Sequence, residues 1–128
     1  MPLKIVLKPG ERMIVDGAVI RNGDTRAAFF VENKVPLLRQ KDILTEESAD
    51  TVCRRIYFTI QLMYMGKTDA VALHGDYWKL VQPLVASVPS TLGLVDRISA
   101  QILAGEYYRA LKLAKELMIY EEEVMNRV

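Results

Sequence analysis

Basic side chains gather in the first third of this chain. Residues 1–44 contain eight Lys or Arg residues against five Asp or Glu, whereas residues 45–128 contain nine against eleven. Seven of the basic residues lie on or beside the strands expected there: Lys4, Lys8, Arg12, Arg21, Arg26, Arg39 and Lys41. Cations on exposed strand edges neutralise phosphates, so these seven are candidate RNA-binding residues. Lys and Arg also protect sheet edges from aggregation, which would explain about half of them.

The sequence gives little support for catalysis or metal binding. The chain has one cysteine, Cys53, and one histidine, His74. A single cysteine excludes an intrachain disulfide, and zinc sites combine several Cys and His ligands, so no metal site is expected. No nucleophile with a base, and no glycine-rich phosphate loop before a helix, is evident. The sequence therefore predicts neither an enzyme nor a bound cofactor.

Residues 1–44 show the pattern of about five short strands. These are expected at residues 3–8, 13–15, 18–21, 27–31 and 35–39. Pro9-Gly10 forces a turn, and both Asp16-Gly17 and Asn22-Gly23 are typical of type I′ hairpins, so two consecutive hairpins predict a meander. Such a small sheet buries little apolar surface. We expect it to need a covering helix or a second copy of itself.

A long amphipathic helix is expected at residues 45–66. Thr45 can act as its N-cap, and Gly66 can adopt the left-handed conformation that ends a helix. Apolar residues recur at spacings of three and four between these ends, with Cys53 on the apolar face. A thiol in that position usually packs rather than reacts.

Three further helices are expected after residue 66. The first runs from Asp69 to about Val88, with a break near Gly75 and a kink at Pro83, or else begins only at Asp76. The second is capped by Ser90 and ended by Gly105, and the third runs from Glu106 to about Asn126. Together with the strands they predict an α+β fold. A small N-terminal antiparallel sheet, meander or barrel-like, at residues 1–44 precedes a bundle of about four helices at residues 45–128, packed on it.

No segment predicts export or membrane insertion. The chain lacks a run of about 18 apolar residues, and its amino-terminal segment lacks the apolar core of a signal peptide. We therefore expect a cytoplasmic protein with no membrane partner.

Three segments resemble the FlbT family of flagellar biosynthesis regulators. They are LKPGERMIVDGAVIRNG, FFVENKVPLLRQKDIL and GEYYRALKLAKELMIYEEE, and their order and spacing extend the resemblance over essentially the whole chain. The resemblance implies a post-transcriptional regulator that associates with the 5′ untranslated region of flagellin mRNA and represses its translation or promotes its decay. It also implies the small flagellar protein FlaF as a partner.

The first 44 residues also resemble the carbon storage regulator family, CsrA. The resemblance lies in the turn from Lys8 to Glu11, the hairpin from Ile14 to Gly17, and the segment VPLLR running into Asp42-Ile43. Members of that family are strand-swapped dimers that grip RNA with their first and last strands. The resemblance implies a homodimer in which Lys8 and Arg39 form one phosphate-binding edge. Replacing both by glutamate is expected to weaken leader RNA binding more than about tenfold. Stability should barely change if both side chains are exposed.

A rival interpretation makes the chain a protein-binding or chaperone-like module of flagellin or FlaF that affects the mRNA only indirectly. RNA binding predicts that the basic residues converge on one face. The rival predicts scattered charges and an exposed apolar groove between helices. The placement of the seven cations therefore bears on both interpretations.

Overall fold

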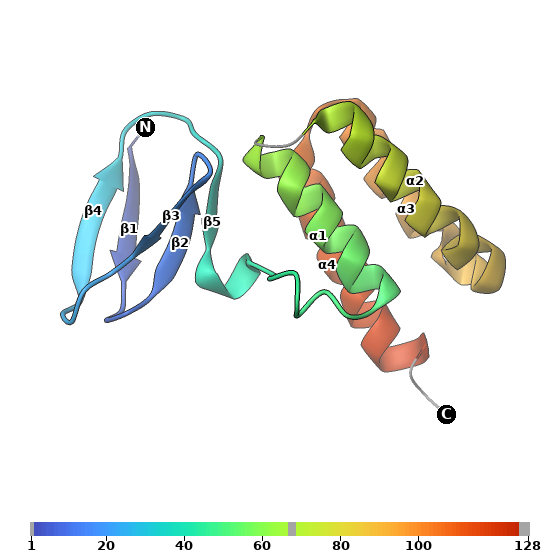
Figure 1. Cartoon of the computed structure of the whole chain (residues 1–128), viewed down its shortest axis with the longest axis horizontal. Coiled ribbons are helices and arrows are strands. Elements are labelled where there is room, and N and C mark those ends of the chain that lie inside the picture. The colour runs from blue at the N-terminus through green and yellow to red at the C-terminus, as the bar shows by residue number, and fades with distance from the viewer. Residues whose placement is uncertain (1, 67–68, 126–128) are drawn as a thin grey trace. The chain divides into compact units, whose positions relative to one another are not determined.

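The computed structural model describes residues 2–66 and 69–125 (Figure 1). The chain divides into two compact units, Met1–Ile43 and Leu44–Val128. The first contains five strands and a short 3-10 helix, and the second contains four α-helices. This order confirms the expected α+β fold. The packing of the helices on the sheet stays a prediction.

Two small antiparallel sheets form the first unit. Strands β1 (Leu3–Leu7) and β4 (Ala27–Val31) make one sheet. In the other, β2 (Arg12–Val15) lies between β3 (Ala18–Arg21) and β5 (Leu37–Arg39). Ile5, Leu7 and Met13 form the buried core, against which Phe29 and Leu37 pack among other partly buried residues. Ile5 and Leu7 alternate with Lys4 and Val6, so Lys4 and Val6 lie on the opposite face of β1.

The first predicted hairpin is confirmed and the second is wrong. Asp16 and Gly17 have φ values of 49° and 83°, as a type I′ turn requires, and they join the paired strands β2 and β3. Strand β4 pairs with β1 rather than with β3. The reason lies in Asn22, whose side-chain amide donates to the carbonyl oxygens of Leu7, Lys8 and Thr25. These bonds tie the end of β3 to the end of β1.

Helix α1 (Val52–Met65) begins later than its sequence pattern predicts. The N-cap is Thr51, which accepts from the Arg54 amide, and Thr45 instead exchanges hydrogen bonds with Ser48 in a separate turn. The Gln61 side chain bonds both backbone groups of Leu44, which holds that residue beside the helix rather than leading into it. The predicted C-terminal residue is confirmed, because Gly66 is left-handed with φ 71°.

The start of α1 is also held by the far end of the helical unit. The buried Glu121 carboxylate accepts hydrogen bonds from the Thr51 hydroxyl and the Cys53 amide. Arg54 forms ion pairs with both Asp50 and Glu122. The last helical segment therefore supplies acceptors for the first turn of α1.

Helix α2 (Ala70–Ser87) is continuous. The expected cap Asp69 is confirmed, but the break near Gly75 and the alternative start at Asp76 are wrong. Leu73 and Tyr77 are buried on one face of this helix, and their packing outweighs the cost of about 1 kcal/mol for a glycine inside it. Pro83 lies within the helix.

Helices α3 (Leu92–Leu103) and α4 (Tyr107–Tyr120) form an antiparallel hairpin. Ser90 is not the cap of α3, because a 3-10 turn at Pro89–Thr91 precedes the helix and the Ser90 hydroxyl bonds Tyr120 instead. A π-helix at Glu121–Met125 follows α4, and the predicted end at Asn126 lies outside the described residues. Helix α1 packs against α2 and α4, and α3 packs against α4. No helix among residues 2–66 and 69–125 has the length and apolarity needed to cross a membrane.

Candidate nucleic-acid interface

A closed turn follows β1 and carries two charged residues. The Lys8 amide donates to Oε1 of Glu11 at 2.9 Å, and the Glu11 amide returns a bond to the Lys8 carbonyl oxygen at 3.1 Å. Gly10 supplies the left-handed residue inside the turn, with φ 71°, as the Pro9-Gly10 pair predicts. The turn therefore fixes the Glu11 carboxylate beside the end of β1.

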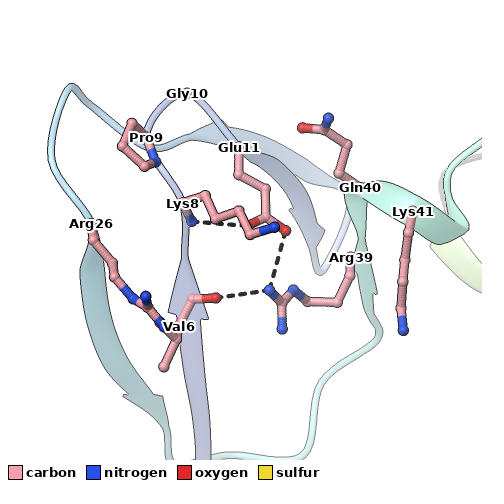
Figure 2. Close-up of a pocket in the computed structure, with 9 residues that line it drawn as sticks. All are labelled: Val6, Lys8, Pro9, Gly10, Glu11, Arg26, Arg39, Gln40 and Lys41. Atoms are coloured by element: carbon pink, nitrogen blue, oxygen red, sulfur yellow. Dashed lines mark hydrogen bonds and ion pairs between the residues drawn. The ribbon is translucent and has the colours of Figure 1, made fainter.

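Arg39 links the last strand to the first. Its Nη2 donates to the carbonyl oxygen of Val6 at 2.8 Å and to Oε2 of Glu11 at 3.1 Å, as Figure 2 shows. The side chains of Arg39 and Glu11 are 34% and 16% exposed. Lys8 and Arg39 thus lie close together, but Arg39 is half-buried and bonded. The charges of both can be reversed at little cost in stability only if both side chains are exposed, and Arg39 does not meet that condition.

These bonds border a pocket of about 620 Å³. Its lining comes from four parts of the first unit: Val6, Lys8, Pro9, Gly10, Glu11, Arg26, Arg39, Gln40 and Lys41. In the view of Figure 2, Arg26 and Lys41 flank the Arg39 guanidinium on opposite sides. Four of the seven predicted cations therefore meet around one hollow, against a single carboxylate.

The charge of this pocket is only partly balanced. The hydrogen bond from the Lys8 amide and then the Arg39 guanidinium hold the pKa of Glu11 below its ordinary value of 4.5, so Glu11 is ionised at neutral pH. Arg39 takes up that negative charge. Within residues 2–66 and 69–125, Lys8, Arg26 and Lys41 form no ion pair. Nε of Arg39 is buried and has no hydrogen-bond partner among those residues. The pocket consequently offers more donors than acceptors, which suits an anionic ligand.

An aromatic ring lies on the same side of the β1–β4 sheet. Directly paired residues of an antiparallel sheet point to the same face, and Lys4 pairs with Phe30. Phe30 is 62% exposed, while Phe29 packs against the core. Val6, which lines the pocket, shares the outward face with Lys4. Lys4 does not line the pocket, but with Phe30 it extends the cationic surface along the sheet.

The remaining two predicted cations lie elsewhere. Arg12 and Arg21 are directly opposite one another in the β2–β3 pair, and both are exposed. Neither lines the pocket, although the Arg12 amide donates to Oε1 of Gln40 at 2.6 Å and so positions one lining residue. The structure therefore brings Lys8, Arg26, Arg39 and Lys41 together and leaves Arg12 and Arg21 as a separate pair.

The whole described chain corresponds to one known family. Residues 3–125 match the family model described as flagellar protein FlbT. The chain belongs to the FlbT family. The predicted resemblance is thereby confirmed, and the segments that carry it include the turn and the strand that bring Glu11 and Arg39 together.

Individual FlbT relatives match along nearly their full length. The chain is 45% identical over 128 residues to the probable flagellum biosynthesis repressor protein FlbT 1 of Bradyrhizobium diazoefficiens, covering 99% of this chain and 87% of the relative. It is 40% identical to the corresponding protein of Rhodopseudomonas palustris strain TIE-1 over 99% of this chain and 100% of the relative. It is 37% identical to the flagellum biosynthesis repressor protein FlbT of Caulobacter vibrioides strain CB 15 over 100% of this chain and 92% of the relative. No solved structure matches.

Some lining residues of this FlbT pocket carry no charge and were missed by sequence reasoning. Gln40 follows β5 and accepts from the Arg12 amide of the neighbouring strand β2, and the Val6 carbonyl oxygen accepts from Arg39 across the two sheets. The glutamine could have been found as the polar residue beside Arg39 and Lys41, but a backbone oxygen leaves no trace in a sequence. Among the described residues, no group of three or more His, Cys, Asp or Glu could hold a metal ion.

Proposed function

We propose that this FlbT protein represses flagellin synthesis by binding single-stranded RNA in the 5′ untranslated region of flagellin mRNA. The RNA backbone lies against the pocket bordered by Lys8, Arg26 and Lys41. The observation that carries the proposal is the convergence of these cations, which are unpaired among the described residues, around one hollow of about 620 Å³. Convergent cations are what phosphate neutralisation requires.

The exposed ring of Phe30 supports RNA over other polyanions. Proteins that bind single strands combine a basic groove with aromatic side chains on which bases stack, at about 1–3 kcal/mol per base. Phe30 is 62% exposed and lies opposite Lys4 on the outward face of β1 and β4. Bases stacked on this ring would leave their phosphates within reach of Lys4 and of the pocket. Repression itself is suggested by the names of the FlbT relatives.

A salt-series gel shift on the flagellin leader RNA tests the proposal. The double variant Lys8→Glu with Lys41→Glu is expected to bind more than about tenfold more weakly. The slope of the logarithm of the binding constant against the logarithm of the salt concentration should become shallower by about 0.7 for each phosphate that the variant no longer neutralises. Both side chains are exposed, so the fold should persist. Lys34→Glu with Lys79→Glu makes the same change in charge at exposed positions outside the pocket and serves as control. Equal affinity of the two double variants would refute the site.

A protein-binding role has one observation of its own. Helices α2 and α3 flank a mostly apolar hollow of about 380 Å³ whose rim includes Trp78, 40% exposed, and Leu92, 48% exposed. Such grooves hold apolar helix faces of partner proteins. As the second candidate function, FlaF or flagellin binds here and influences the mRNA indirectly. Calorimetry with purified FlaF and purified flagellin tests it, because Trp78→Asp should abolish binding while Lys79→Asp, on the same helix, should not.

A further inference from the structure

The helical unit has a basic groove of its own, between α3 and α4. This hollow of about 370 Å³ is lined by Arg97, Ala100, Gln101, Arg109, Lys112 and Leu113. Arg97, Ala100 and Gln101 share one side of α3, and Arg109, Lys112 and Leu113 share one side of α4, because residues three and four apart in a helix lie on the same face. Ala100 is small, so it leaves the floor of the groove open.

The cations of this groove are not balanced by acids within the described chain. In the part of the chain that the structure describes, Arg97, Arg109 and Lys112 take part in no ion pair, and all three are exposed. Nearby acids are Asp96, beside Arg97 in sequence, Glu106, one turn before Arg109, and Glu116, one turn beyond Lys112, but none of the three lines the groove. Like charges so close together repel one another, and an anionic ligand would relieve that repulsion.

An aromatic pair lies at the edge of the same groove. The Lys112 Nζ is 5.1 Å from the centroid of the Tyr108 ring, and the Tyr108 and Tyr64 rings are 5.6 Å apart at 40°. Tyr108 is 43% exposed. Lys112 therefore contacts the Tyr108 ring by a cation–π interaction and also lines the groove. One continuous surface therefore offers a ring for stacking and three cations for phosphates, which is the combination found in single-strand binders.

We propose that this groove is a second binding site for single-stranded RNA, with Arg97, Arg109 and Lys112 on successive phosphates and Tyr108 stacked on a base. The inference rests on the proposed function, that the chain binds RNA. It extends that function by giving the protein two separate RNA-binding surfaces, one on each unit. An acidic protein segment would use the cations but not the exposed part of the Tyr108 ring, so the geometry favours RNA.

The test uses the full chain, the flagellin leader RNA and a salt series. Arg97→Glu with Arg109→Glu is expected to weaken binding about tenfold or more and to lower the salt slope by about 1.4, because two phosphates are no longer neutralised. The control is Arg55→Glu with Lys79→Glu, which makes the same charge change at exposed positions of α1 and α2 away from the groove and should cost about twofold or less. Thermal unfolding checks the fold. If the double glutamate variant unfolds, the double variant Arg97→Gln with Arg109→Gln is used in its place, because it removes the two charges without reversing them.

Stacking is tested separately at Tyr108. Tyr108→Ala should weaken binding about fivefold or more, while Tyr108→Phe, which keeps the ring, should bind like the wild type. A purely structural role would lower the melting temperature of Tyr108→Ala without changing the affinity of the protein that remains folded.

Failure of this inference is distinguishable from failure of the proposed function. If the groove variants bind like their control while Lys8→Glu with Lys41→Glu loses affinity, the groove inference is overturned and the pocket on the first unit stands. Binding of a poly-glutamate probe that disappears in the groove variants, with RNA affinity unchanged, assigns the groove to acidic protein and also overturns it. A wild-type chain that binds no leader RNA at any salt concentration overturns both.

Discussion

Nη2 of Arg39 lies 2.8 Å from the carbonyl oxygen of Val6, so one side chain joins strands β5 and β1, which belong to different sheets. The same nitrogen bonds Glu11, which the Lys8 amide holds in turn. The residues that order this corner also line the pocket proposed for RNA. Arg39 therefore contributes to the fold, while Lys8, Arg26 and Lys41 remain available to a ligand.

Arg39→Ala should destabilise the protein by about 1–3 kcal/mol, because it removes hydrogen bonds to a carbonyl oxygen and to a carboxylate. Lys41→Ala, in the same pocket but exposed, should stay within about 0.5 kcal/mol of the wild type. Urea unfolding at neutral pH measures both. Equal stabilities of the two variants would show that the Arg39 bonds contribute nothing to the folded state.

Glu11→Gln should make stability less dependent on pH. The folded-state pKa of Glu11 is lowered, first by the Lys8 amide and then by Arg39, so folding favours the ionised form. Its contribution is complete above the unfolded value of 4.5 and is lost as pH falls through the lower folded value. The variant should therefore be less stable than the wild type at about pH 7 and approach it below about pH 4.

Urea titrations at several pH values test this, with Glu32→Gln as control at an exposed loop position. The opposite trend, a difference that grows as pH falls, would mean that protonated rather than ionised Glu11 is the form the fold prefers.

Local chemistry made parts of the fold predictable. Asp16-Gly17 and Gly66 require positive φ values that few residues tolerate, so their turns follow from sequence alone. The start of α1 cannot be predicted from sequence alone, because Thr45 and Thr51 are both good N-cap residues. The choice of Thr51 depends on the Gln61 bonds to Leu44 and on the Glu121 carboxylate, which come from distant parts of the chain. The second hairpin failed for the same reason, since the Asn22 side chain bonds the end of β1, a distant segment, and β4 pairs with β1 rather than with β3.

The candidate site was predictable in composition but not in arrangement. The excess of Lys and Arg in residues 1–44 indicated the right region, yet it gave Arg12 and Arg21 the same weight as Lys8 and Arg26. Only the pairing of β1 with β4 brings Lys8 and Arg26 to one end of a sheet. The groove on α3 and α4 could have been found from the helical spacing of Arg109 and Lys112, but its third cation, Arg97, comes from another helix.

Cys53 should be almost unreactive in the folded protein. Burial, and then the neighbouring Glu121 carboxylate, raise the pKa of its thiol to about 12, so little thiolate exists at about pH 8. Glu121→Ala removes two hydrogen-bond acceptors from the start of α1 and should cost about 1–3 kcal/mol. Labelling of Cys53 by iodoacetamide should then be faster, by about tenfold for each 1.4 kcal/mol of lost stability, because the locally unfolded form that exposes the thiol is more populated.

Glu123→Ala, at an exposed position of the same helical segment, is the matched control and should label like the wild type. Labelling of wild-type Cys53 at the rate of a free cysteine would contradict the burial on which this prediction depends.

A fragment of residues 1–44 should be unfolded as a monomer. Its core cluster consists of Ile5, Leu7 and Met13, and Ile14 and Leu38 are its other buried apolar residues. Domains of about 40 residues usually need oligomerisation or a cross-link to fold. A fragment of residues 45–128 buries more large side chains, among them Ile56, Tyr77, Ile98 and Leu117, and should fold alone. Circular dichroism and sedimentation over a range of concentrations show whether each fragment is unfolded, a folded monomer or a folded oligomer. If the first fragment acquires strand structure only as it dimerises, the predicted homodimer gains support. A soluble monomer of residues 1–44 that unfolds cooperatively would show that these few buried side chains and the bonds of Arg39 are sufficient, and the thin core would no longer argue for a second copy.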